Sequence, residues 1–377
     1  MRVYLDNAAT TPLDEEVLDA MLPVLKDGFG NPSSTHSYGR KIKSLIERAR
    51  KNVAKHINCT PGEIFFTSGG TEADNMAIRC AVKDLGVKHI VTSTIEHHAV
   101  GHTINRLKTK GLVDVTYVHL DENGHVDLQH LDQILSTSAK TLVSLMHANN
   151  EVANLLPLNR VSEICQKHGA VFHSDTVQTM AHYRFDMQEL EQVHFLACSA
   201  HKFHGPKGVG FLYVNKSVQI NPLIHGGSQE RNMRGGTENV YGIVGLSKAM
   251  DVAYKDLNTH QNYVIDLKSY MIEQLNNSIV GVKYNADSSS MDNSLYTILS
   301  VSLPPTDIAP MMLFNMDIMG VACSGGSACT SGSNIGSHVL EGIDAPNNRP
   351  TIRFSFSRFN TKEEIDYAVD CLVKLYS

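Results

Sequence analysis

The chain has 377 residues, more than one ordinary hydrophobic core accommodates, so two domains are expected. Its net charge of -6, without a basic block, argues against nucleic acid as a partner. No apolar run is long enough to span a bilayer and the first residues lack a secretory signal, so we expect no membrane partner and a cytoplasmic location.

Strand and helix patterns alternate along the first part of the chain and predict an α/β fold. Asp14 is a good N-cap for a helix that runs to about Lys26, and an amphipathic helix is predicted at 40–57. Further helices are predicted from about residue 97, at 127–135 and at 158–168. Strands are predicted at 63–67, 88–93, 113–118, 141–146, 170–174, 193–198 and 208–214. Repeated β-α units imply a mostly parallel seven-stranded sheet between helices.

The pattern changes after residue 214 and predicts a smaller α+β domain. A polar, glycine-rich loop at 225–240 leads into helices at 239–256 and about 260–277. The remaining predicted elements are strands at 280–284, 296–302, 319–322 and 350–356, with helices at 307–316 and 361–375. We place the large domain at 14–258 and the small domain at 1–13 and 259–377.

Five polar clusters follow five successive predicted strands. In an open α/β sheet, ligands gather at the carboxyl ends of the strands, so the clusters together predict a site. They lie at 69–71, 96–98, 147–151, 175–178 and 199–202.

The lysine in the last cluster, Lys202, lies in a turn between two apolar runs. If desolvated, its amine becomes a competent nucleophile that can form a Schiff base with an aldehyde cofactor such as pyridoxal 5'-phosphate. A solvated turn lysine is the alternative.

Each neighbour has a role if that cofactor binds. Asp175 would keep the pyridine nitrogen protonated, His97 would supply a plane against the ring, and Gln178 would donate to the ring hydroxyl oxygen. The candidate phosphate donors are Gly70, Thr71, Ser199 and His201. A helix N-cap for Asp175 and a packed core histidine for His97 remain open.

Cys329 lies in GGSACTSGS, a run of small residues that predicts an exposed loop with a lone thiol, which makes it a nucleophile candidate. Cys323 is a weaker alternative. Among the seven cysteines there is no CxxC pair and no metal-ligand spacing, so neither a disulfide framework nor a metal site is expected. Arg353, on an alternating strand, suits a substrate carboxylate or a structural ion pair.

Ten motifs along nearly the whole chain carry a resemblance. In order they are YLDNAATTP, NPSSTHSYGR, SGGTEADNMAI, EHHAV, HANNEV, DTVQ, SAHKFHGPKGVG, RGGTENV, GGSACTSGS and IRFSFSRF. The sequence resembles cysteine desulfurases of the NifS/IscS type, pyridoxal-phosphate enzymes of aminotransferase class V with the fold-type I architecture.

The resemblance implies a role for each matching residue. Lys202 forms the Schiff base, and His97 stacks on the ring and moves protons. The cofactor contacts it implies are Gly70, Thr71, His97, Asn150, Asp175, Gln178, Ser199, His201 and Lys202, with Thr237 reaching the phosphate of the other subunit of a homodimer. Asn31, Asn150 and Arg353 hold the substrate.

The implied reaction converts L-cysteine to L-alanine, with sulfur captured as a persulfide on Cys329 for an acceptor or iron–sulfur scaffold protein. Cys329 would contact a cluster only transiently. The loop after Cys329 has the length of the NifS/IscS group rather than the SufS group. Two departures are Ala153, where the family usually has glycine, and a short C-terminus. Selenocysteine lyase, another class V aminotransferase-type enzyme and a non-catalytic scaffold are the alternatives.

Overall fold

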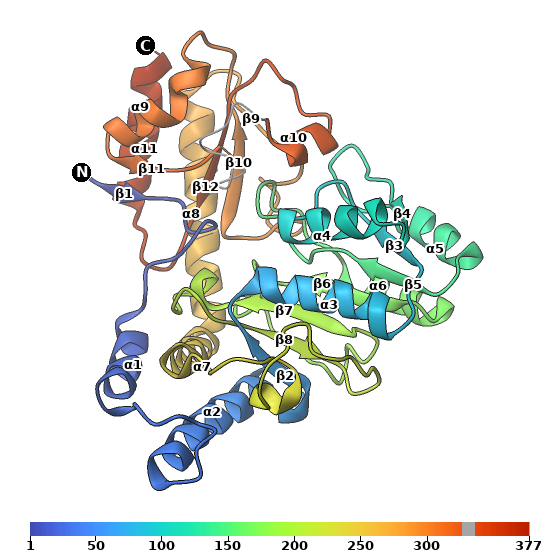
Figure 1. Cartoon of the computed structure of the whole chain (residues 1–377). Coiled ribbons are helices and arrows are strands. Elements are labelled where there is room, and N and C mark those ends of the chain that lie inside the picture. The colour runs from blue at the N-terminus through green and yellow to red at the C-terminus, as the bar shows by residue number, and fades with distance from the viewer. Residues whose placement is uncertain (326–335, 377) are drawn as a thin grey trace.

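The computed structural model describes residues 1–325 and 336–376, and Figure 1 shows a lobe built on a large sheet beside a lobe built around a long helix. The sheet contains seven strands in the order β2-β8-β7-β6-β5-β3-β4. These strands are β2 Ile64–Thr67, β3 His89–Thr92, β4 Asp114–Tyr117, β5 Thr141–Ser144, β6 Val171–Asp175, β7 Phe195–Ser199 and β8 Gly210–Val214.

The central pairings of this sheet are parallel, from β4 through β3, β5 and β6 to β7. Strand β8 runs antiparallel to both β7 and β2. Each predicted strand of the large domain is present, and the predicted mostly parallel α/β sheet is confirmed. A parallel pair needs a crossover, which here places helices over both faces of the sheet.

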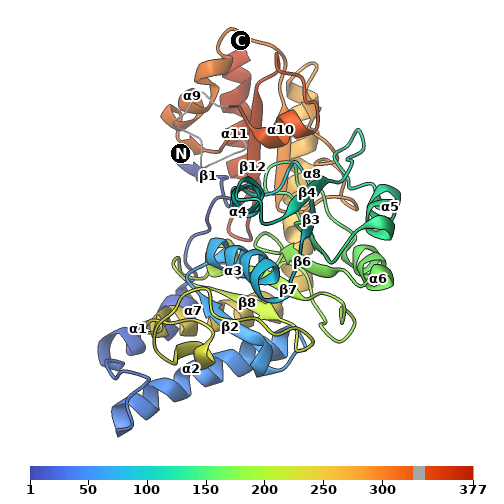
Figure 2. The same cartoon turned by 45° about the vertical axis from the view of Figure 1, so that its right-hand side comes forward.

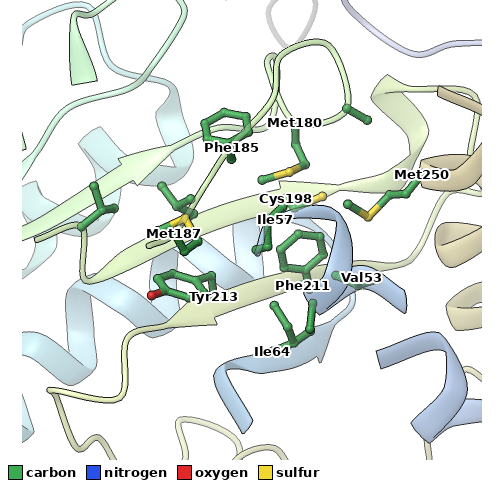
Figure 3. Close-up of a cluster of buried hydrophobic side chains, with 14 of the residues drawn as sticks. Val53, Ile57, Ile64, Met180, Phe185, Met187, Cys198, Phe211, Tyr213 and Met250 are labelled. Carbon is green, nitrogen blue, oxygen red and sulfur yellow. The ribbon is translucent and has the colours of Figure 1, made fainter. Parts of the chain in front are cut away.

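Alternation along β7 shows how the two faces are covered. Phe195 and Ala197 pack with residues of helices α3 and α4, whereas Leu196 and Cys198 face the opposite core with α1, α2, α5, α6 and α7. Successive strand residues point to opposite faces, so an apolar run buried on both sides serves two cores. Figure 3 shows part of the core that contains Cys198, in which Cys198 and Phe211 lie among side chains from several elements.

The helices of this lobe are α1 Glu15–Asp27, α2 Ser37–His56, α3 Gly70–Asp84, α4 His98–Thr109, α5 Leu128–Thr137, α6 Leu158–His168 and α7 Val240–Lys255. Short 3-10 turns are η1 Pro61–Glu63, η2 Ala200–Lys202 and η3 Gln229–Asn232. Asp14 caps α1 as predicted, because its carboxylate accepts from the Glu16 amide at 2.8 Å. Helix α2 begins three residues before the predicted position, where the His36 ring accepts from the Gly39 amide.

The second lobe is built around α8 Leu257–Ser278, which runs beside a three-stranded sheet of order β12-β10-β9 (Figure 1). Its other elements are β1 Val3–Tyr4, β9 Lys283–Tyr284, β10 Ile298–Ser302, η4 Ala309–Met311, α9 Met312–Ile318, β11 Val321–Ala322, α10 His338–Gly342, β12 Thr351–Ser355 and α11 Lys362–Tyr376. Sequence patterns missed α10, which is only five residues long.

The N-terminal segment belongs to the second lobe by its contacts. Strand β1 pairs in parallel with β11, and Val3, Leu5 and Ala8 share a hydrophobic core with α8, β10 and α11. The domain division at about residue 258 stays a prediction, which this separate core supports. No helix in the described part of the chain combines the length and apolarity that crossing a membrane requires.

Candidate active site

A cavity of about 510 Å³ opens at the carboxyl ends of the parallel strands, between the two lobes. The sequence-predicted residues that line it are Gly70, Thr71, His97, Asn150, Asp175, Gln178, Ser199, His201, Lys202 and Arg353. They come from five strand ends and from β12, so the fold brings together residues separated by almost 300 positions in the sequence.

Lys202 ends the 3-10 turn that follows β7. Its Nζ donates to the main-chain oxygens of Ala8 and Ala9, at 2.6 and 2.9 Å, so the lysine reaches across to the N-terminal segment. The imidazole of His182 lies 3.1 Å from the Lys202 carbonyl oxygen and 2.9 Å from the Tyr296 hydroxyl. The turn that carries the amine is therefore held from both sides.

Asp175 ends β6 and is buried. One carboxylate oxygen accepts from the Val177 amide at 2.8 Å. Burial raises the pKa of Asp175 to about 6, against the opposing effects of that amide and of the Lys202 charge. Gln178 lies on the same wall of the cavity, and its amide donates to the Ala8 oxygen at 3.0 Å.

His97 is the N-cap of α4, where its Nδ1 accepts from the Ala99 amide at 3.1 Å. Burial and, second to it, the nearby Lys202 charge lower the pKa of His97 to about 4. The ring is therefore neutral, with its other nitrogen protonated, and the cap fixes its orientation on the cavity wall.

The N-terminus of α3 forms one end of the cavity, with Gly70 and Thr71 in its first turn. Ala73 is the first residue of this turn to donate along the helix, to the Gly69 oxygen, which leaves the preceding amides pointing out of the helix. A β-carbon at Gly70 would lie 2.4 Å from Val177 Cγ2. Ser199 also lines this end of the cavity. The outward-pointing amides and the positive end of the helix dipole make this end a candidate anion-binding site.

Arg353 is almost fully buried beneath the cavity. Its guanidinium donates to Asp6 Oδ1 at 2.9 Å and to the main-chain oxygen of Asn150 at 2.6 Å, while its buried Nε finds no hydrogen-bond partner among the residues that the structure describes. The structural ion pair proposed as the alternative is thus present, and a substrate carboxylate would share this arginine with Asp6.

A profile of the aminotransferase class-V family matches residues 3–368. The chain belongs to the aminotransferase class-V family. It is 43% identical over 377 residues to a cysteine desulfurase IscS of Dictyoglomus turgidum, an alignment that covers 99% of this chain and 94% of the relative.

Solved structures of related proteins have the same fold. A NifS-like protein has a TM-score of 0.91 at 37% identity, covering 100% of this chain and 99% of that one. SspA in complex with cysteine has a TM-score of 0.81 at 31% identity, covering 96% and 100%. The predicted fold-type I architecture is confirmed by these similarities.

Three predicted residues lie outside the cavity of this single chain or outside the described residues. Asn31 is exposed, and its side-chain oxygen accepts from the Ser33 amide. Thr237 lines a separate pocket of about 150 Å³. Cys329 falls within 326–335, outside the described residues. Their roles stay predictions.

Cys323, the weaker candidate nucleophile, lies within the described residues. Burial raises the pKa of its thiol to about 12, so the reactive thiolate is scarce at neutral pH. Ala153, the departure from the family pattern, has φ 68°, a left-handed conformation that favours glycine.

Sequence reasoning gave no role to Asp74 and His338, which also line the cavity. Asp74 lies one helical turn after Gly70, and that spacing places both residues on the same face of α3. His338 lies on the unpredicted α10, and its Nε2 donates to the main-chain oxygen of Glu96 at 2.8 Å. Helical spacing could have identified Asp74, whereas no local signal pointed to His338.

Proposed function

We propose that this chain is a pyridoxal-phosphate-dependent cysteine desulfurase that converts L-cysteine to L-alanine and holds the sulfur as a persulfide on Cys329. The single observation that carries the proposal is the meeting of Lys202, Asp175 and His97 in one cavity. The cysteine desulfurase named above, which matches nearly the whole chain, supports the same substrate.

The residues present fit pyridoxal 5'-phosphate. The α3 N-terminus, Ser199 and His201 offer donors to a phosphate, Asp175 is a buried carboxyl for a ring nitrogen, and His97 presents a neutral ring. When bound, this cofactor supplies an electron sink that stabilises the charge left when an α-proton departs.

The residues of the chain would divide the remaining work. Nζ of Lys202 takes the α-proton of the substrate, and His97, neutral at physiological pH, can pass protons nearby. The Cys329 thiolate attacks the substrate sulfur, so that an S–S bond forms as the Cβ–S bond breaks. The electron pair stays with carbon, which takes up a proton to give alanine.

We also propose a homodimer. Helices α1, α2 and α7 lie side by side at the edge of the large lobe in both views (Figure 1, Figure 2). Large apolar side chains are exposed along this edge, namely Leu18, Leu22, Leu25, Phe29, Tyr38 and Tyr241. Large apolar side chains gathered on one edge favour burial against a second copy. Thr237 would then contribute to the partner's phosphate site.

The sulfur acceptor, an iron–sulfur scaffold or another acceptor protein, and the cytoplasmic location belong to the same proposal. Selenocysteine lyase activity is the alternative function, because the Cβ–Se bond can break with its electron pair staying on carbon, so that selenium leaves as elemental selenium without a thiol nucleophile. Alanine formation from cysteine and from selenocysteine, measured with and without Cys329, separates the two. Cys329→Ser should keep the cofactor's visible absorbance and lose turnover of cysteine, and unchanged turnover would refute a desulfurase.

A further inference from the structure

Two buried carboxyl groups that line the cavity, Asp74 and Asp175, lie near a third buried carboxyl group, Glu96. Asp74, Glu96 and Asp175 are 1%, 4% and 5% exposed. The mechanism above uses only Asp175. Carboxylates buried in one region cannot all ionise unless cations neutralise them, so the question is which of these three groups carries a charge.

Strand geometry places Asp74 on the same side of β6 as Asp175. His173 and Asp175 are two residues apart on β6 and therefore share a face of the sheet. The Nε2 atom of His173 lies 3.3 Å from Asp74 Oδ1, and its Nδ1 lies 2.9 Å from the Ser144 hydroxyl. Asp74 and Asp175 also line the same cavity.

The contact between Asp74 and His173 is close but not a well-directed hydrogen bond. Both Asp74 Oδ1 and His173 Nε2 lack a hydrogen-bond partner within the described residues. An ionised carboxylate in the protein interior needs hydrogen-bond donors to its oxygens. A buried oxygen without a donor adds the full free-energy cost of desolvation to the charged form. The orphaned oxygen therefore argues against a charged Asp74.

The positive charge near the cluster is also too small to neutralise three carboxylates. Burial lowers the pKa of His173 to about 3, so the imidazole is neutral, and His97 is neutral as described above. Lys202 is the cation that acts on Asp175. Glu96 accepts from the Met146 amide and the Ser93 hydroxyl, but its second oxygen is buried and has no partner in the described part of the chain.

The directions of the pKa shifts agree with this geometry. Burial, followed by the Asp175 and Glu96 charges, raises the pKa of Asp74 well above its ordinary value. Burial raises the pKa of Glu96 to about 8, whereas that of Asp175 rises only to about 6. Asp175 is thus the carboxyl group of the three that ionises most readily.

We propose that Asp74 is a positioning residue that stays a neutral carboxylic acid and so leaves Asp175 as the single carboxylate facing the cofactor's ring nitrogen. The part that concerns the cofactor rests on the proposed function. The charge state of Asp74 is a property of the protein alone and can be measured without the cofactor.

The first test uses infrared spectroscopy of the apo-protein at pH 7, in which a protonated acid and a carboxylate absorb separately. Asp74→Asn should remove absorption of one protonated acid and no carboxylate absorption. Asp175→Asn, the matched control, should remove carboxylate absorption. Loss of a carboxylate band in Asp74→Asn would overturn the proposal.

The second test titrates the apo-proteins with pyridoxal 5'-phosphate and follows the visible absorbance and its pH dependence. Asp74→Asn, which mimics a neutral acid, should bind within about threefold of the parent, whereas Asp175→Asn should weaken binding about tenfold or more. Asp74→Ala should weaken it about tenfold because the space beside Asp175 is emptied, with recovery in Asp74→Asn.

Two results would overturn the positioning role: Asp74→Asn binding as poorly as Asp175→Asn, or Asp74→Ala binding as well as the parent. If Asp74→Ala does not fold, the comparison of the two asparagine variants still decides. A parent protein that binds no pyridoxal 5'-phosphate would refute the proposed function, while the infrared test would still decide the charge of Asp74.

Discussion

A buried ion pair fixes the loop that follows β8, and its removal gives a quantitative prediction. Arg50 of α2 is 1% exposed and Glu230 of η3 is 4% exposed. The guanidinium donates to both Glu230 oxygens at 2.7 and 2.8 Å and to the Ile64 carbonyl at 2.8 Å. The Phe66 amide also donates to Glu230, at 2.8 Å. Glu230 therefore holds the 225–239 segment, with Thr237, against the edge of the sheet.

Replacing Glu230 with Gln removes the charge and leaves Arg50 buried beside a neutral amide. Breaking a buried pair by removing one partner costs about 3–5 kcal/mol, because the remaining charge loses its buried counter-ion. Glu47 provides a matched control, since it pairs with the same guanidinium at 3.1 Å but its side chain is 35% exposed. Glu47→Gln should cost only about 0–1 kcal/mol.

Urea unfolding of both variants and the parent at pH 7 measures these losses as changes in the free energy of unfolding. We expect the Glu230→Gln loss to exceed the Glu47→Gln loss by about 2 kcal/mol or more. Equal losses in the two variants would refute the reasoning that the buried pair anchors this loop.

Three further predictions concern the site. Gly210→Ala should lower the unfolding temperature and weaken cofactor binding, because the added β-carbon would lie 2.0 Å from the main-chain oxygen of Cys198. An unfolding temperature and a cofactor affinity equal to those of the parent would contradict this prediction. His182→Leu leaves the Lys202 carbonyl without its imidazole donor and should slow loading of pyridoxal 5'-phosphate about tenfold, whereas His182→Gln should restore the loading rate. Equal stopped-flow loading rates in the two variants would exclude a specific role for this hydrogen bond. Because the pKa of Glu96 is raised to about 8, the folded state binds the Glu96 proton more tightly than the unfolded state does. The free energy of unfolding of the parent, relative to that of Glu96→Gln, should therefore fall as pH rises from about 4.5 to 8. A constant difference between the two proteins in urea unfolding across that range would contradict this prediction.

Local patterns in the sequence predicted the sheet and most of the cavity wall. The strands are short apolar runs followed by polar residues, so the position of Asp175 and Ser199 at strand ends could be read directly. The antiparallel direction of β8 was not predicted, although the turn that joins it to β7 is too short for the crossover that a parallel pair needs.

The parts that sequence reasoning missed depend on contacts between distant segments. Asp6 pairs with Arg353 across 347 positions, and His182 reaches Tyr296 across 114. Neither pairing has a local spacing that would predict it. Asp74 was contained in a recognised motif, but its significance appears only once α3 is packed against β6 and His173.

The central claim is tested most directly by incubating the purified holoenzyme with L-cysteine and measuring alanine together with the mass of the peptide that contains Cys329. The proposed function predicts alanine and a peptide heavier by one sulfur atom, with both lost in Lys202→Ala. Alanine formation at the parental rate in Cys329→Ser, or an unmodified Cys329 peptide during turnover, would contradict it.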